Sequence, residues 1–177
     1  MRKGFFIVVV FTLMLAGQKC TNSAQGPQYF STKDGLVELQ FPAGWFVNEK
    51  ENPYDLQCFS KDQSLNTGIF LYRMQDLASD LNAQQLLRLQ VADIQSKREN
   101  FYTLEPQAAS YDGGKTLTTE VYSGEKDQST YTYKFTLIEF SENSDIVLVA
   151  LQVAFPSSWD TDRPILDGIL RSARIKS

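Results

Sequence analysis

Histidine, the side chain that most often serves as a general base near neutral pH, does not occur in this sequence of 177 residues. Its absence excludes catalysis by Ser-His-Asp and Cys-His groups and zinc sites with histidine ligands. The two cysteines, Cys20 and Cys58, are too few to hold a zinc ion or an iron–sulfur cluster on their own. A mechanism that uses carboxylates alone remains possible.

Two short acidic motifs contain the residue types of a binding site. The sequence DGGK at 112–115 lacks the spacing of a phosphate-binding loop and is not followed by a helical pattern, so it predicts a hairpin turn. The sequence DTD at 160–162 could bind a divalent cation, but it precedes an apolar helical pattern, which favours helix capping. Glu139 and Glu142 flank the end of a predicted strand, where solvated carboxylates are expected.

No pattern in the sequence brings two carboxylates together, as hydrolysis of a glycosidic bond would require. We therefore predict a protein that is not an enzyme, with no catalytic residue, no metal site and no cofactor. A hydrolase that uses carboxylates alone stays open as a minor alternative.

Three aromatic residues are candidates for contact with a partner. Tyr131 and Tyr133 alternate on one face of a predicted strand, and Trp159 stands just before the last predicted helix. Tyrosine is enriched at protein interfaces, whereas aromatic side chains in general tend to be buried. Burial in the core is the favoured interpretation, and a surface that faces a partner is the alternative.

Residues 1–19 predict a signal peptide. Arg2 and Lys3 precede an apolar run from Phe5 to Ala16, which is shorter than the ~20 residues of a membrane-spanning helix. We therefore expect the protein to be exported to the periplasm or the cell envelope.

Cys20 is a candidate for lipidation. The sequence LAGQKC at 15–20 resembles a bacterial lipoprotein box, in which the cysteine becomes the lipidated N-terminus. That pattern requires a small residue directly before the cysteine, and Lys19 occupies this position. A lipid-anchored protein and a soluble exported protein, cleaved after Gly17 or within TNSA, both stay open. Residues 20–27 predict a flexible tether, and residues 28–177 predict one domain.

The charge of the chain bears on its partners. The net charge is −4, and loss of residues 1–20 would leave 14 basic and 21 acidic residues, a net charge of −7. An acidic surface disfavours nucleic acid as a partner, because binding to phosphates requires a basic surface.

The first strands are predicted to form a hairpin over 28–42 that ends in a corner. Asp34-Gly35 suits its turn, and the residues of the buried face are Val37, Leu39 and Phe41. Pro42 ends the strand, and Gly44 permits a sharp bend. Trp45 is then expected to pack onto the core as the anchor of this corner.

Further strands are predicted at 54–60, 66–74, both arms of 103–124, 129–140 and 145–155. In the first of these, alternation places Tyr54, Leu56 and Cys58 on one face, with Cys58 as a small buried apolar residue. The segment 145–155 is apolar on both faces from Ile146 to Val149, which is typical of a central strand covered on both sides.

Two amphipathic helices complete the pattern. The first begins at Asn82, with Gln85 in the position of a capping box and with Lys97 and Arg98 near its C-terminal end. The second lies within 157–175. Its features are Asp160 to Asp162 as candidate caps, Pro164 in the first turn, and Gly168 as a point of close approach to the sheet. The whole pattern predicts an α+β fold, an antiparallel β-sheet packed with two main helices.

Five segments, in this order, resemble the PsbP-like superfamily. They are VELQFPAGW (37–45), LNAQQLLRLQVADI (81–94), YTYKF (131–135), DIVLVALQVAF (145–155) and ILDGILRSARI (165–175). This superfamily includes an extrinsic protein of photosystem II, a nuclear factor that acts on a Ran-type GTPase, and exported bacterial proteins of the DcrB type. The resemblance covers about residues 28–176 and implies a PsbP-like α/β sandwich.

The resemblance also implies a helper or assembly role more often than an enzymatic one. Together with the signal peptide, it predicts a non-catalytic protein of the cell envelope that binds another protein or assists assembly. Contact with the membrane is expected only through a lipid on Cys20. The alternative is a periplasmic protein that binds a small ligand or a cation between the sheet and a helix.

Overall fold

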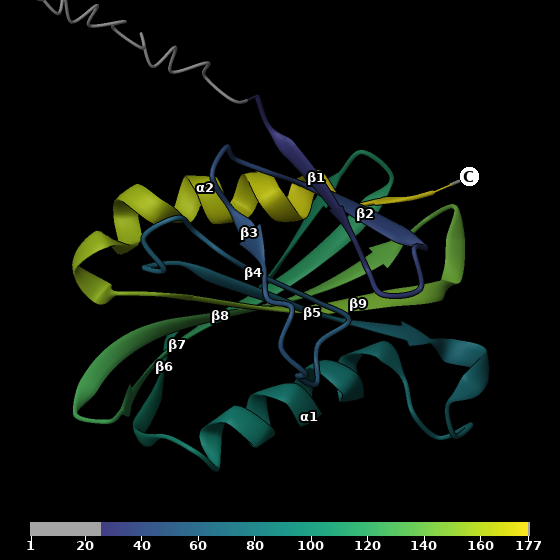
Figure 1. The fold of residues 1–177 in the computed structure, drawn as a ribbon. Helices are drawn as coiled ribbons and strands as arrows, with labels where there is room; N and C mark the ends of the chain where they lie inside the picture. The colour runs from purple at the N-terminus through teal and green to yellow at the C-terminus, as the bar shows by residue number, and fades with distance from the viewer. Residues whose placement is uncertain (1–25, 177) are drawn as a thin grey trace, which may run out of the picture.

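The computed structural model describes residues 26–176, which form two antiparallel sheets and two α-helices (Figure 1). The predicted signal peptide, Cys20 and most of the predicted tether lie outside the described residues. The α+β class predicted from the sequence is confirmed.

The small sheet consists of β1 (Gln28–Ser31), β2 (Val37–Phe41) and β10 (Arg174–Ile175). The strands of the large sheet are β3 (Phe46–Val47), β4 (Leu56–Phe59), β5 (Asn66–Arg73), β6 (Glu99–Asp112), β7 (Lys115–Lys126), β8 (Ser129–Phe140) and β9 (Asn143–Ala154). The helices are α1 (Ala83–Gln95) and α2 (Trp159–Arg171), and short 3-10 turns lie at Met74–Asp76 and Pro156–Ser158.

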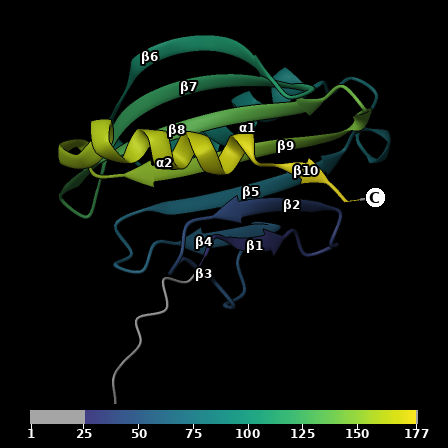
Figure 2. The same cartoon turned by 90° about the horizontal axis from the view of Figure 1, so that it is seen from above.

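The large sheet separates two layers of core. Its strand order is β3-β4-β5-β9-β8-β7-β6, so β9 is the middle strand. The helix α2 and the small sheet cover one face, and α1 covers the other (Figures 1 and 2). Side chains of β9 alternate between the two cores, with Leu148 on the α2 side and Val149 on the α1 side. The prediction of a central strand at 145–155 is therefore confirmed.

The corner after β2 has the predicted structure. Val37, Leu39 and Phe41 are at most 1% exposed, and Gly44 adopts a φ of +83°, which favours glycine. Trp45 is buried, and its ring centroid lies 5.4 Å from that of Phe41.

In the predicted strand at 54–60, the prediction that the first residue, Tyr54, shares a face with Leu56 and Cys58 is wrong. Leu56 and Cys58 belong to the core on the α2 side, as predicted. Tyr54 instead packs on the α1 side, with its ring centroid 4.7 Å from that of Phe70. Alternation does not extend to this position because β4 begins only at Leu56.

The helix α1 begins as predicted. The side chain of Asn82 accepts a 3.0 Å hydrogen bond from the backbone N–H of Gln85, and the Gln85 side chain accepts one of 2.7 Å from the Asn82 N–H. The helix ends at Gln95, so Lys97 and Arg98 lie beyond its last turn. Lys97 forms an ion pair of 2.6 Å with Asp93.

The helix α2 begins earlier than expected, because the 3-10 turn at Pro156–Ser158 continues into it. Asp160 and Asp162 therefore lie in its first turn and are not caps, and Pro164 lies inside the helix. The prediction for Gly168 is also wrong: a Cβ atom added there would meet no atom within 4 Å.

Both edges of the large sheet are poorly suited to further pairing. The edge strand β3 has two residues. The edge strand β6 contains Pro106, and its pairing with β7 shifts register at three places between Glu99 and Ala108. Short strands, bulges and proline are features that limit edge-to-edge association.

Candidate functional site

The helix α1 is too short to cover its face of the sheet. Its 13 residues span about 20 Å, whereas the 12 residues of β8 or of β9 span about 40 Å. At the end where β8 begins and β9 ends, side chains therefore reach the surface. Tyr131 at this end is half-buried, and Phe155, directly after β9, is 41% exposed.

These side chains line an open pocket with a volume of about 320 Å³, which we call the aromatic pocket. Its lining residues are Phe59, Gln63, Ser64, Asn66, Arg98, Lys126, Tyr131, Tyr133, Val153 and Phe155. The strands β4, β5, β7, β8 and β9, the β4–β5 loop and the loop between α1 and β6 supply these residues. The hydrogen bonds of the large sheet therefore fix the position of most of the lining. Two lining residues are cationic and none is acidic.

Aromatic rings form one wall of the aromatic pocket. The centroid of the Tyr131 ring lies 5.3 Å from that of Phe155 and 6.3 Å from that of Tyr133. Phe59, across the sheet, stacks at 5.9 Å on Phe46, which is 41% exposed. The pocket therefore continues into an exposed aromatic surface at Phe46.

Arg98 is held in a fixed position at this pocket. Its Nε atom donates a 2.7 Å hydrogen bond to the hydroxyl oxygen of Tyr133, and one Nη atom donates to the carbonyl of Lys97 at 2.8 Å. Its guanidinium carbon lies 5.4 Å from the centroid of the Tyr133 ring. Within residues 26–176, no carboxylate lies within 4.0 Å of Arg98, and its second Nη atom makes no hydrogen bond.

Two further lining residues carry hydrogen-bond donors that meet no acceptor within residues 26–176. The hydroxyl oxygen of Tyr133 accepts from Arg98, so its own proton is free to donate elsewhere. Burial raises the pKa of Tyr133, with Arg98 acting in the opposite direction, so the hydroxyl is protonated at neutral pH. Asn66 uses its carbonyl oxygen to accept a 3.4 Å hydrogen bond from Gln57, which leaves its amide NH2 free.

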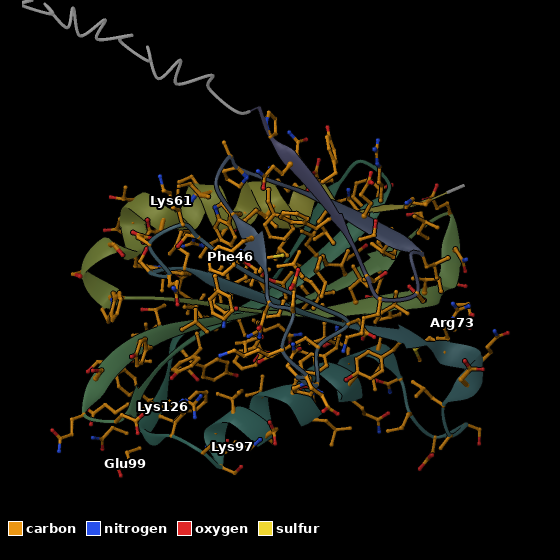
Figure 3. All side chains as sticks on the ribbon, in the orientation of Figure 1. Phe46, Lys61, Arg73, Lys97, Glu99 and Lys126 are labelled. Atoms are coloured by element: carbon orange, nitrogen blue, oxygen red, sulfur yellow. The ribbon has the colours of Figure 1, made fainter. Side chains whose placement is uncertain are left out.

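A second hollow adjoins the aromatic pocket and differs in charge. Its lining includes Lys97, Glu99 and Lys126, which lie at the same corner of the molecule in Figure 3, and also Glu125 and Asp127. Arg98 and Lys126 therefore line both hollows, whereas the three acidic residues line only the second.

The structure separates the three predicted contact residues. Tyr131 lies in the wall of the aromatic pocket and is half-buried. Tyr133 is 2% exposed, which excludes it from a directly exposed contact surface, although its hydroxyl group lies at the pocket. Trp159 packs against the core on the opposite face of the sheet, with the Arg163 guanidinium carbon 5.8 Å from its ring centroid. Cys20, the candidate for lipidation, lies outside the described residues.

Sequence reasoning did not identify Arg98, Asn66 or Phe155 as site residues. Arg98 was expected to interact with the dipole of α1, and nothing near it in the sequence points to Tyr133. Asn66 and Phe155 reach Tyr133 through the pairing of β5 with β9 and of β9 with β8. Arg98, in the loop between α1 and β6, reaches it because α1 packs on β8.

A second cleft, between the large sheet and α2, has the position that the sequence suggested for a ligand site. It has a volume of about 200 Å³ and includes Lys134, Arg163 and Asp167. Burial lowers the pKa of Lys134, and this side chain is paired with Asp167. Arg163 forms hydrogen bonds of 2.6 and 3.0 Å to both carboxylate oxygens of Glu105. Lys134, Arg163 and Asp167 are therefore paired within the chain. Arg171 also lines this cleft and forms no ion pair within residues 26–176.

The other motifs have structural roles. The sequence DGGK at 112–115 forms the β6–β7 turn, and Lys115 donates to the carbonyls of Arg171 and Ala173 at 2.6 and 2.8 Å. Burial raises the pKa of the Cys58 thiol to about 12, so it is not a nucleophile at neutral pH. Within residues 26–176, no three acidic or cysteine side chains gather into a group that could hold a metal ion. Neither α1 nor α2 has the length and apolar character needed to cross a membrane.

Comparison with known proteins identifies relatives in structure but not in sequence. No protein-family model and no curated protein sequence matches this chain. The chain is similar to cyanobacterial PsbP (CyanoP) from Synechocystis sp. PCC 6803, with a TM-score of 0.63 and 14% identity over 85% of this chain and 93% of that one.

Two further structures have the same fold. LpqN, described as involved in cell envelope biogenesis of Mycobacterium tuberculosis, gives a TM-score of 0.60 and 12% identity over 85% of this chain and 91% of LpqN. The Ran-binding protein Mog1p of Saccharomyces cerevisiae gives a TM-score of 0.55 and 10% identity over 85% of this chain and 95% of Mog1p. Similarity at such identities establishes the fold alone. The chain has the PsbP/Mog1-like α+β fold.

Proposed function

We propose that this protein is a non-catalytic, exported protein of the cell envelope that binds a protein partner through the aromatic pocket and assists assembly. The observation that carries the proposal is Arg98, a guanidinium fixed at an aromatic wall with no carboxylate partner in the described chain. Arginine and aromatic side chains together are the residue types that dominate binding energy at protein interfaces.

The fold gives this proposal support by analogy. LpqN is described by a role in cell envelope biogenesis, and Mog1p is described by the partner that it binds. Because one fold hosts many functions, this analogy supports a binding role without identifying the partner.

Export, and attachment to the membrane through Cys20, form part of the same proposal. If Cys20 is lipidated, intact-mass measurement of the membrane fraction should show the mass of the lipid. The variant Cys20→Ser should then move to the soluble fraction. Unchanged partitioning of this variant would refute lipidation of Cys20.

Site-specific photo-crosslinking in intact cells tests the binding role. A photoreactive phenylalanine at Phe155 should give one discrete crosslinked product with an envelope protein. The same residue at Tyr111 on β6 or at Leu89 on α1 is the control, because both side chains are exposed and neither lines the pocket. Equal products at all three positions, or none at Phe155, would contradict the proposal.

A small anionic ligand is the second candidate, and the volume of the aromatic pocket favours it. About 320 Å³ is at the lower end of the range for small-molecule sites. A cation is not favoured there, because the charged lining residues are Arg98 and Lys126. A protein recovered with a bound small molecule, and without a crosslinked partner at Phe155, would support this second candidate.

A further inference from the structure

We infer that the aromatic pocket recognises a carboxylate standing next to an aromatic or aliphatic side chain, presented by an acidic segment of a partner protein. The inference deepens the proposed function and depends on it for the identity of the ligand as a protein. It names the chemistry that the partner must carry.

Charge is the first reason. Both charged residues that line the pocket, Arg98 and Lys126, are cationic, although the chain as a whole has a net charge of −4. Lys126 lies 4.0 Å from Asp127 in a contact at the limit of an ion pair, and both side chains are more than half exposed. Arg98 has no such neighbour among the described residues. A carboxylate ligand would supply the partner that Arg98 lacks.

The hydrogen-bonding groups are the second reason. The free Nη atom of Arg98, the hydroxyl proton of Tyr133 and the amide NH2 of Asn66 are all donors, and all three residues line one cavity. An ionised carboxylate is an acceptor only, with room for about four hydrogen bonds, so it matches this set. A cationic ligand would face these donors without an acceptor.

The aromatic wall of the pocket indicates which kind of side chain should lie next to the carboxylate of the ligand. The ring centroids of Tyr131 and Phe155 lie 5.3 Å apart in a tilted arrangement, and Phe155 is 41% exposed. An aromatic or aliphatic side chain next to the acid would cover this surface, and aromatic pairs add to the gain from burial. An acid without such a neighbour would leave the wall exposed.

The mouth of the pocket favours a single carboxylate over an extended anionic surface. Glu99, Glu125 and Asp127 line the adjoining hollow together with Lys97, Arg98 and Lys126, so this hollow carries charges of both signs. A broad anionic surface such as a lipid membrane would bring negative charge against the three carboxylates as well as against the cations, and like charges repel. A peptide segment can place one acid in the pocket and keep the rest of its chain away from them.

Defined peptides test the inference on the mature protein purified from cells that export it. The probes are the capped peptides Ac-Gly-Phe-Asp-Gly-amide, its Asn counterpart, and its counterpart with Ala in place of Phe. Binding is followed by the amide NMR signals of Asn66, Arg98 and Tyr131. We expect the Phe-Asp peptide to bind about tenfold more tightly than either counterpart, because charge-assisted hydrogen bonds and aromatic burial are both needed.

Two variants assign the effect to Arg98. Arg98→Gln removes the cation and should abolish the preference for Asp over Asn. Lys97→Gln removes the same charge from the neighbouring residue, which is exposed and paired with Asp93, and should leave binding unchanged. Arg98→Lys should bind with intermediate affinity, because a lysine keeps the charge and loses the planar fork. Unchanged thermal unfolding of the variants shows that they are folded.

Three results would overturn the inference. They are equal binding of the Asp and Asn peptides, an Arg98→Gln variant that keeps the preference, and no signal change with any peptide. Vesicles that contain phosphatidylglycerol are tested in the same way. If the vesicles shift the amide NMR signals of the pocket residues and the peptides do not, the ligand is a lipid surface. Crosslinking at Phe155 without peptide binding would leave the proposed function standing and reject only the carboxylate preference. Peptide binding without crosslinking would support the carboxylate preference and reject the proposed function.

Discussion

The ammonium group of Lys134, in the middle of the large sheet, donates a hydrogen bond to the carboxylate of Asp167 on α2. The side chain of Lys134 is 4% exposed and that of Asp167 is 33% exposed. The same ammonium group donates to the side-chain carbonyl of Gln152 at 3.2 Å, and the Gln152 amide donates to the backbone carbonyl of Leu166 at 2.9 Å. A buried cation therefore connects β8, β9 and α2.

Replacing Asp167 with Asn should destabilise the protein by about 3 kcal/mol, because the buried Lys134 cation then lacks its counter-charge. Adding Lys134→Met should recover at least half of that loss, since no buried charge remains. Chemical denaturation of the two variants measures both values. Asp160→Asn, in the exposed first turn of α2, is the control and should change stability little. A double variant less stable than Asp167→Asn would contradict this account.

Cys58 should make the protein less stable at alkaline pH. Burial raises the pKa of its thiol from 9.0 to about 12, so above pH 9 the unfolded chain loses a proton that the folded chain keeps. The contribution of the buried thiol to the free energy of unfolding is complete below pH 9. It is lost as the pH rises towards 12, at about 1.4 kcal/mol per pH unit. The measurement is the free energy of unfolding of the protein and of Cys58→Ala between pH 8 and 10.

The difference between the free energies of unfolding of these two proteins reports on the thiol alone, because the tyrosines titrate alike in both. The wild-type protein should lose stability faster than Cys58→Ala above pH 9 and at the same rate below it. Parallel curves across the whole range would mean that the thiol has an ordinary pKa.

Trp45→Ala should cost about 3–5 kcal/mol, as expected for loss of a large buried aromatic side chain. Trp45 is 6% exposed and packs on Phe41 at the corner after β2. Phe46→Ala, one residue later, removes a ring that is 41% exposed and should cost much less. Urea unfolding of both variants gives the comparison, and similar losses would show that the corner is not anchored by Trp45.

Gly68→Ala should destabilise the protein by about 1–3 kcal/mol, because the new methyl group would overpack the core on the α1 side. A Cβ atom at Gly68 would lie 2.4 Å from the ring of Tyr54. In a Tyr54→Leu background the same change should cost less, since the ring is absent. Thermal unfolding of the single and double variants measures this coupling, and additive effects would refute it.

The sequence predicts most of the fold because local patterns determine it. The alternation of Val37, Leu39 and Phe41, the capping box at Asn82 and the glycine turn at 113–114 each depend on a few neighbouring residues, and each is present. Boundaries were less predictable. Tyr54 and Pro164 were misplaced because a turn before β4 and a 3-10 turn before α2 change the register of the pattern.

The aromatic pocket could be predicted only in part. Tyr131 was identified as a candidate because tyrosine repeats at alternate positions in the sequence. Asn66 was not, because it lies near Tyr133 only after β9 has paired with both β5 and β8. Arg98 was not, because it lies in the loop between α1 and β6 and meets Tyr133 only when α1 packs on β8. Buried Lys134 shows the same limit: its position looked like the polar face of a strand until α2 covered it.

The irregular pairing of β6 and the two-residue length of β3 have a consequence for the protein at high local concentration. Neither border of the large sheet offers a long, straight row of free backbone groups. Neighbouring copies held close together therefore gain little from joining strand to strand, which is the first step towards insoluble assemblies. The protein can be concentrated on a surface while its copies remain separate.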